Sequence, residues 1–274
     1  MRRVSSRKIN NKKKLITVFS IMIILSIGFF VGYKIAEYQN PTVKADIIAS
    51  DEIMNDREEK TDQVISQEVD EQMEVMNVYK PDGNKIAYLT FDDGPSNVTP
   101  KILDILKKNN IHASFFVIGN LAEARSDLIK REVQEGNKVY NHTYTHVYKD
   151  LYSSPQSFID NVNKCNETLK NILGASYNSK IIRFPGGSFG SNLAPYRDAI
   201  SKAGYSYIDW NSLSGDSESK SLPPDKLVAR LKQTAKSQHL VILMHDASGK
   251  DTTAQALQSI IDYLISNGYT FKTL

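Results

Sequence analysis

Two adjacent carboxylates close a short apolar run in the chain. Residues 90–95 read Thr-Phe-Asp-Asp-Gly-Pro, so Asp92 and Asp93 stand between an apolar stretch and a Gly-Pro turn. Neighbours on a strand point to opposite faces, but both carboxylates can converge on one site where a strand breaks into a turn. One could then bind a cation while the other takes a proton. The alternative interpretation is an acidic turn that caps a helix.

His142 and His146 form a His-x-x-x-His pair directly after a short apolar stretch. Imidazoles four residues apart share a face once the chain turns helical, and zinc sites use this spacing. Because two of the five histidines can fall four apart by chance, a third ligand is needed, and Asp93 can supply it. A set of two histidines and one aspartate leaves positions open for water and a substrate carbonyl, which is typical of a catalytic metal site.

Further polar side chains stand where other apolar runs end. Arg183 precedes a Pro-Gly-Gly turn. Paired with Asp92, it would hold that carboxylate ionised, and the turn at Gly186 could present a backbone N–H to an oxyanion. Asp216 follows the fifth run and His245 ends the sixth. Because the carboxyl ends of parallel strands form one face of a barrel, we expect these side chains to converge.

The elements that must position these residues begin near residue 85, where apolar runs start to alternate with amphipathic segments. Helices are expected to begin at Thr99-Pro100, with Thr99 as N-cap, and at a second N-cap, Ser126. The alternation predicts an α/β domain with a parallel sheet, as a distorted (β/α) barrel of seven or eight strands, and no Rossmann glycine fingerprint is present. Cys165 falls on an apolar helical face, so we expect a core residue. Strands are predicted at residues 86–91, 113–118, 138–140, 181–184, 205–209, 240–244 and 269–272.

The order of these five chemical segments resembles the NodB homology domain of the polysaccharide deacetylases, carbohydrate esterase family four. The resemblance covers about residues 84–272. It implies that Asp92 is the general base and His245 the general acid, that Arg183 orients Asp92, and that Asp216 tunes both Arg183 and His245. The metal ligands that it implies are Asp93, His142 and His146.

The resemblance also implies a reaction, the removal of acetyl groups from N-acetylated sugars. The metal would polarise the acetamide carbonyl, and the backbone N–H near Gly186 would stabilise the oxyanion. The segment after Arg183 departs from the pattern of many family members, which have an aromatic residue after the proline, and Ser217 stands where a tryptophan often follows. Both departures concern the walls of the substrate site. The other residues expected on the substrate side are Tyr144, Trp210 and Leu243.

The first 83 residues differ from the rest in charge. Residues 1–14 hold seven bases and no acid, and the remaining residues hold 27 bases and 31 acids, so the net charge of +3 does not predict nucleic-acid binding by the folded part. Residues 15–33 are uncharged and long enough to approach the ~30 Å hydrocarbon thickness of a bilayer. We expect a membrane anchor at residues 15–36 rather than a cleaved signal peptide, since no small-x-small site follows closely.

The basic residues before the anchor predict a cytoplasmic amino terminus, an acidic stalk at residues 37–83 and an extracellular catalytic domain at residues 84–274. A short stalk keeps that domain near the membrane, so peptidoglycan is the expected polysaccharide substrate. Chitin oligosaccharide, xylan and exopolysaccharide remain alternatives, as does an inactive carbohydrate-binding surface protein. The ligand set suits Zn²⁺ but also Co²⁺, Ni²⁺ or Fe²⁺. The acetylated sugar and the oligomeric state stay open.

Overall fold

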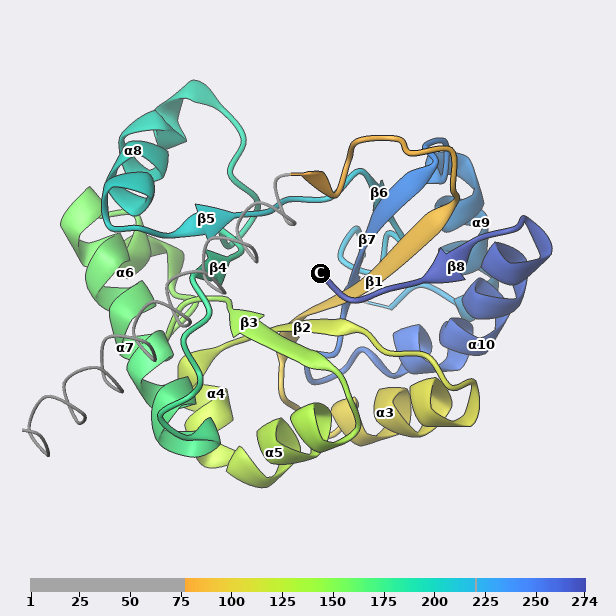
Figure 1. The fold of residues 1–274 in the computed structure, drawn as a ribbon, viewed down its shortest axis with the longest axis horizontal. Coiled ribbons are helices and arrows are strands. Elements are labelled where there is room, and N and C mark those ends of the chain that lie inside the picture. The colour runs from red at the N-terminus through yellow and green to blue at the C-terminus, as the bar shows by residue number, and fades with distance from the viewer. Residues whose placement is uncertain (1–76, 220) are drawn as a thin grey trace, which may run out of the picture. The chain divides into compact units, whose positions relative to one another are not determined.

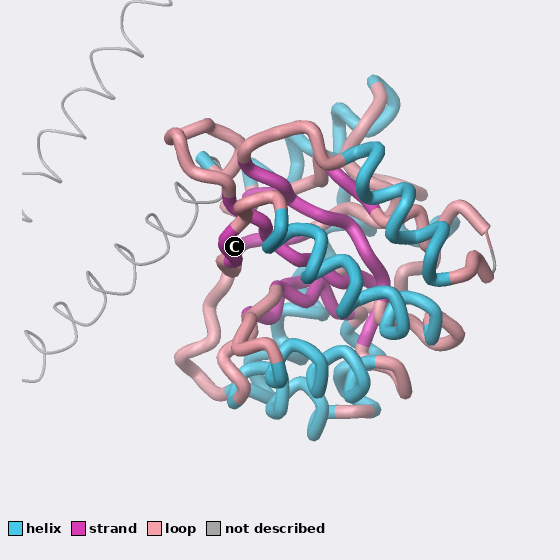
Figure 2. The backbone as a smooth tube through the Cα atoms, turned by 90° about the vertical axis from the view of Figure 1, so that its right-hand side faces the viewer, coloured by secondary structure: helices cyan, strands magenta, loops and turns pink. Residues whose placement is uncertain are grey.

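A computed structural model describes residues 77–219 and 221–274 of the chain. The expected basic tail, the membrane anchor and all of the stalk up to residue 76 lie outside these residues. Within the described ranges, no helix is long and apolar enough to cross a membrane. The strands are grouped in the interior of the domain, and most helices lie outside them (Figure 2).

Every strand of the sheet runs parallel to the strands with which it pairs. The order is β5-β4-β3-β2-β1-β7-β6. Strand β1 pairs with β7 along its length, and its other edge is shared by β2 near Asp92 and by β8 near Ile86. The strands are β1 (Ile86–Gly94), β2 (Ser114–Val117), β3 (Lys138–Asn141), β4 (Ile181–Ile182), β5 (Ser206–Tyr207), β6 (Ser212–Leu213), β7 (His239–His245) and β8 (Thr270–Phe271).

Helices follow most of the strands and surround the sheet (Figure 1). The longest helix of the described residues, α7, is followed by the C-cap Gly174, whose φ of 99° suits a residue without a side chain. The helical segments are α3 (Thr99–Lys108), α4 (Gly119–Ala124), α5 (Ser126–Gln134), α6 (Tyr148–Leu151), α7 (Pro155–Leu173), the short 3₁₀ helix η1 (Ser191–Leu193), α8 (Ala194–Lys202), α9 (Pro224–Thr234) and α10 (Asp251–Ser266).

The parallel α/β sheet expected from the sequence is confirmed, and each of the seven predicted strands is present. The sheet curls as a partial barrel, because β5 and β6 end the strand order and do not pair with each other among the described residues. Strand β6 was not predicted, since Ser212 and Leu213 alone give no apolar pattern. The predictions that Thr99 and Ser126 cap their helices are wrong: the N-cap of α3 is Val98 and that of α5 is Arg125.

The two faces of the sheet carry separate apolar clusters. Along β1, Ala87, Leu89 and Phe91 join the cluster that contains the buried faces of α3 and α10, whereas Ile86 and Tyr88 join a smaller one. This alternation follows from the two-residue period of a strand. Continuing it places Thr90 and Asp92 on the face of the smaller cluster, and both are buried.

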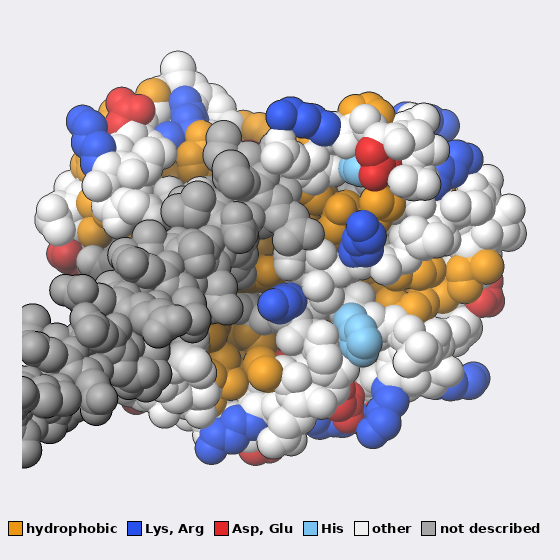
Figure 3. Space-filling view, viewed as in Figure 1, with side chains coloured by type: hydrophobic (Ala, Val, Ile, Leu, Met, Phe, Trp, Pro, Cys, Tyr) orange, Lys and Arg blue, Asp and Glu red, His pale blue; other side chains and the backbone are white. Residues whose placement is uncertain are grey.

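Helix α7 buries the apolar stripe that the sequence predicted, including Cys165. Cys165 is fully buried, and burial raises the pKa of its thiol, so the cysteine is a core residue. Elsewhere, Lys and Arg side chains occur at several separate places on the face shown in Figure 3.

Residues 77–83, ahead of the boundary expected at residue 84, pack against the domain. Val78 is only 4% exposed and belongs to the smaller apolar cluster. His239, which begins β7, bonds this segment through both ring nitrogens: Nδ1 lies 2.8 Å from the Val78 carbonyl oxygen and Nε2 lies 3.0 Å from Asp82 Oδ1. This short segment therefore belongs to the folded unit.

Val78→Ala should lower the free energy of unfolding by about 2 kcal/mol, because two buried methyl groups are lost. The measurement is urea denaturation of the soluble fragment 38–274. The matched control is Val133→Ala, since Val133 is 43% exposed and its change should stay within about 0.5 kcal/mol of wild type. Equal effects of the two substitutions would contradict the packing of residues 77–83.

Candidate active site

The two acidic side chains lie at the end of strand β1. Asp92 pairs in register with His245 of β7 and shares a strand face with Thr90. On a regular strand Asp93 would point to the opposite face. Its φ of 70° is left-handed, however, and the pairing with β2 is irregular between Asp92 and Gly94. The strand breaks at this point, as the sequence suggested, and the Asp93 carboxylate reaches the histidines.

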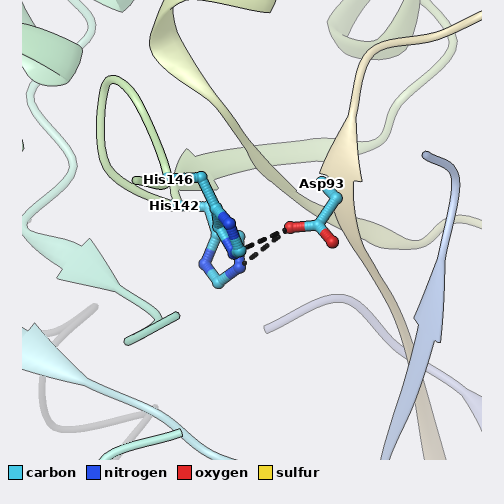
Figure 4. A group of neighbouring side chains, drawn as sticks. All are labelled: Asp93, His142 and His146. Atoms are coloured by element: carbon cyan, nitrogen blue, oxygen red, sulfur yellow. Dashed lines mark ion pairs between the residues drawn. The ribbon is translucent and has the colours of Figure 1, made fainter. Parts of the chain in front are cut away.

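Asp93, His142 and His146 form a compact cluster (Figure 4). Asp93 Oδ1 lies 3.3 Å from His142 Nε2 and 3.1 Å from His146 Nε2. Burial alone would raise the pKa of Asp93, but the neighbouring imidazoles of His142 and His146 outweigh burial and lower it. The cluster therefore combines an ionised carboxylate with two imidazoles.

The two histidines lie on a loop. The prediction that a helical turn brings them to one face is therefore wrong. Thr143 and His146 have left-handed φ angles of 70° and 57°. Two asparagine side chains support this loop: Asn141 Oδ1 accepts from the Thr143 N–H at 2.8 Å, and Asn161 Oδ1 accepts from the backbone N–H groups of residues 144 and 145 at 2.8 and 3.0 Å. The ring centroids of the two histidines are 5.0 Å apart.

Arg183 is fully buried and is bonded on all sides. Its Nη1 donates to Asp92 Oδ1 at 2.8 Å and to Thr90 Oγ1 at 2.7 Å. Nε and Nη2 donate to the carbonyl oxygens of Ile208 and Asp209, each at 3.1 Å. These bonds occupy one oxygen of Asp92. The other oxygen, Oδ2, faces His142 Nε2 at 3.8 Å, beside the cluster.

His245 is held by Asp216. Its Nδ1 lies 2.8 Å from Asp216 Oδ1, and its backbone N–H donates to Asp216 Oδ2 at 2.8 Å. Thr253 donates to the same Oδ2. Burial alone would lower the pKa of His245, but the hydrogen bond and charge of Asp216 outweigh burial and raise it to about 9. Asp216 thus contacts His245, whereas its hydrogen bonds among the described residues do not reach Arg183.

The segment after Arg183 forms a tight turn. The Gly187 N–H donates to the Phe184 carbonyl oxygen at 2.8 Å, and Gly186 has a φ of 78°. A proline followed by a left-handed glycine at these positions is typical of a type II turn. Gly186 is an exposed residue, and its N–H has no hydrogen-bond acceptor among the described residues.

Aromatic rings stand on both sides of this turn. A side chain on Gly186 would collide with the Tyr148 hydroxyl, and one on Gly187 would collide with Phe189. The Tyr148 ring lies 5.5 Å from that of His146, and the Phe189 ring meets that of Trp210 edge to face at 5.4 Å. Tyr148 and Phe189 are 51% and 55% exposed, so they present apolar surface to solvent, Tyr148 next to His146 and Phe189 next to Trp210.

The residues of the cluster fit a divalent cation. Asp93 Oδ1 is buried and has no hydrogen-bond partner among the described residues. His142 Nδ1 lies 2.9 Å from the Arg183 carbonyl oxygen, so it carries the proton and leaves the Nε2 lone pair facing Asp93. Donor atoms at ~2.1 Å from a tetrahedral ion lie ~3.4 Å apart, close to the observed separations. Two nitrogens and one oxygen suit a transition metal and leave coordination positions open.

The structure brings most of the residues named from the sequence to one end of the sheet. Leu243 lies on the same side of β7 as His245, in register with Thr90. Tyr144 is the exception: its hydroxyl donates to Glu123 in α4. The left-handed Thr143 turns the chain between the first histidine and this tyrosine, so the Tyr144 hydroxyl bonds α4 and not the cluster. A contact between Tyr144 and substrate stays a prediction. The residues brought together are Asp92, Asp93, His142, His146, Arg183, Gly186, Trp210, Asp216 and His245.

Several contributing residues could not be recognised from the sequence. Tyr148 begins the short helix α6 and Phe189 stands in a polar loop, and neither belongs to a periodic pattern. Asn161 lies in the middle of α7. Asn141 was the only one with a positional signal, since it ends strand β3 directly before the first histidine. Its side chain also donates to the Val162 carbonyl oxygen, which ties the loop to α7.

Comparison with known proteins agrees with this geometry. Residues 79–208 match the family described as polysaccharide deacetylase. The chain is 33% identical over 192 residues to a peptidoglycan-N-acetylglucosamine deacetylase of Bacillus cereus, covering 69% of this chain and 68% of that protein. It is also similar to a solved Streptococcus mutans CE4 esterase, with a TM-score of 0.66, 32% identity and coverage of 75% of this chain and 90% of that one.

A second solved structure is the catalytic domain of a peptidoglycan N-acetylglucosamine deacetylase from Eubacterium rectale. The TM-score is 0.64 at 34% identity, and the match covers 71% of this chain and 90% of that chain. The two solved relatives therefore share the fold and about a third of the aligned sequence with this chain.

His142→Ala should weaken zinc binding by more than ~100-fold, because it removes a donor atom and not only a supporting contact. His112→Ala is the matched control, since His112 is exposed and does not belong to the cluster. The measurement is competition for zinc with a chromogenic chelator. Zinc affinity that fell equally in both variants, or in neither, would contradict the assignment of the cluster.

Proposed function

The chain belongs to the polysaccharide deacetylase family, carbohydrate esterase family four, and from that premise we propose that it hydrolyses the N-acetyl groups of amino sugars in peptidoglycan. The observation that carries this proposal is the position of Asp92. One of its oxygens is held by Arg183, and the other faces the cluster of Asp93, His142 and His146. A base therefore stands beside a set of metal ligands.

A divalent cation, proposed to be zinc, would polarise the acetamide carbonyl when bound to Asp93, His142 and His146. Asp92 Oδ2 lies beside the cluster, so Asp92 would take a proton from a water as the water oxygen bonds to the carbonyl carbon. Arg183 keeps the Asp92 carboxylate aimed by donating to Oδ1. The N–H of Gly186, which has no acceptor among the described residues, would bond the oxyanion that forms.

His245 is the proposed acid. Asp216 bonds Nδ1 of its ring and leaves Nε2 for the substrate. Protonation of the sugar nitrogen lets the carbon–nitrogen bond break, which gives acetate and an amino sugar. A pKa of about 9 keeps His245 protonated at neutral pH, in the state that an acid needs.

Peptidoglycan is proposed as substrate because the two peptidoglycan-N-acetylglucosamine deacetylases named above align with most of this domain. The amino-terminal sequence is consistent with this substrate: the uncharged run at residues 15–33 and the basic residues before it suggest an anchor that would hold the domain outside the membrane, near the wall. Tyr148, Phe189 and Trp210 would then contact sugar rings, since aromatic faces offer rigid apolar surface beside polar groups.

The direct test is acetate release by the soluble fragment 38–274 from purified peptidoglycan, with chitin oligosaccharide and acetylated xylan in parallel. We expect acetate from peptidoglycan that stops with chelator and returns with zinc. Mass spectrometry of the digested wall should then show loss of acetyl from one sugar. Release from another polymer only would overturn the substrate, and no release from any of the three would contradict the activity.

Asp216→Asn should shift the alkaline limb of the kcat profile to lower pH. In wild type the raised pKa lets His245 keep its proton until the pH rises through about 9. Without the carboxylate, the pKa should fall toward the ordinary value of ~6.5 and the proton should be lost earlier. The control is Asp104→Asn, because Asp104 is an exposed acid that pairs with Arg131. An unchanged limb in Asp216→Asn would contradict the acid role.

Phe189→Ala should raise KM for an oligosaccharide substrate several-fold with a smaller effect on kcat, because the ring would bind substrate and transition state alike. Phe189→Tyr keeps the ring and should retain the wild-type KM. Steady-state kinetics on a soluble chitin oligosaccharide provide both constants. A loss of kcat with unchanged KM in Phe189→Ala would contradict a role in sugar binding.

A further inference from the structure

Thr99 begins helix α3, but its side chain does not serve that helix. The helix has no side-chain cap, and its N-cap is Val98. The Thr99 hydroxyl is fully buried, accepts a hydrogen bond from the Ser96 N–H at 2.8 Å and donates to Asp246 Oδ2. A hydroxyl at a helix start usually bonds the helix's own N–H groups. This one instead connects the loop after β1 to the end of β7.

Asp246 is the centre of that connection. It follows His245 directly and is fully buried. Its backbone N–H donates to the Asp92 carbonyl oxygen at 3.1 Å, and its own carbonyl oxygen accepts from Ser96 Oγ at 2.5 Å. Through its main chain and side chain it therefore contacts the loop on both sides of Asp93.

The Asp246 carboxylate also fills the space beside Gly94. A side chain built on Gly94 would overlap with all three atoms of that carboxylate group. The carboxylate is thus packed against the backbone of Gly94. The residue before it, Asp93, has the left-handed φ of 70°. A non-glycine residue in that conformation persists only when surrounding contacts hold it, because the conformation costs of order 1–3 kcal/mol.

We propose that Thr99 and Asp246 are positioning residues for the metal site: their hydrogen bond holds the turn at Asp93 in the left-handed conformation that aims its carboxylate at His142 and His146. Neither residue is a ligand. They act through Asp93, in the way that hydrogen-bonding partners of metal ligands elsewhere raise affinity by fixing ligand orientation. The inference rests on the proposed metal site but not on the identity of the polysaccharide.

The test compares two substitutions at residue 99 in the soluble fragment 38–274. Thr99→Val keeps the shape of the side chain and removes the hydroxyl, so zinc affinity should fall ~10–100-fold. Thr99→Ser keeps the hydroxyl and removes a buried methyl, so the melting temperature should fall while zinc affinity stays within about threefold of wild type. Zinc dissociation constants come from chelator competition, and melting temperatures from circular dichroism of the zinc-free protein.

Thr234→Val is the matched control. The Thr234 hydroxyl bonds the backbone of residue 213 at 3.1 Å and does not contact the ligand segments, so its loss should lower the melting temperature without changing zinc affinity. Wild-type affinity in Thr99→Val would overturn the proposal. So would equal losses in Thr99→Val and Thr99→Ser, because packing and not the hydroxyl would then matter. Failure of wild type itself to bind zinc would instead refute the metal site.

Discussion

The buried Arg183 is the interaction on which the rest of the site depends. Its guanidinium joins β1 to the chain after β5. It bonds the side chains of Thr90 and Asp92 in β1 and the two backbone carbonyl oxygens that follow β5. Its own carbonyl oxygen fixes the ring of His142. One residue therefore sets the direction of both the proposed base and one ligand. Breaking a buried ion pair of this kind costs about 3–5 kcal/mol, so the constraint is rigid.

Around that pair, strained backbone brings the ligands together. Of the four left-handed residues other than glycine among the described residues, Asp93, Thr143 and His146 belong to the ligand segments. Side-chain contacts offset this strain: Asn141 and, from α7, Asn161 support the histidine loop, and the Asp246 carboxylate lies beside β1. The parallel strands bring the ligand residues to one edge of the sheet, and the loops after the strands orient their side chains toward one another.

The sequence predicted the strands well because buried parallel strands are continuous apolar runs. It also indicated which polar residues would converge, since each follows such a run. It could not predict how they converge. The His142–His146 spacing suggested a helix, whereas contacts from α7 make a left-handed loop. The Thr99-Pro100 pair suggested a helix cap. The Thr99 hydroxyl instead bonds Asp246, which lies too far along the chain to be recognised as its partner. Such contacts between distant residues leave no local pattern.

The central claim is that two neighbouring carboxylates have different tasks, with Asp93 binding the cation and Asp92 taking the proton. It is tested most directly by measuring zinc affinity and kcat side by side in Asp92→Asn and Asp93→Asn. The account predicts that Asp92→Asn binds zinc nearly as wild type does but turns over no substrate, and that Asp93→Asn loses zinc. Retained turnover in Asp92→Asn, or equal loss of zinc in both variants, would contradict it.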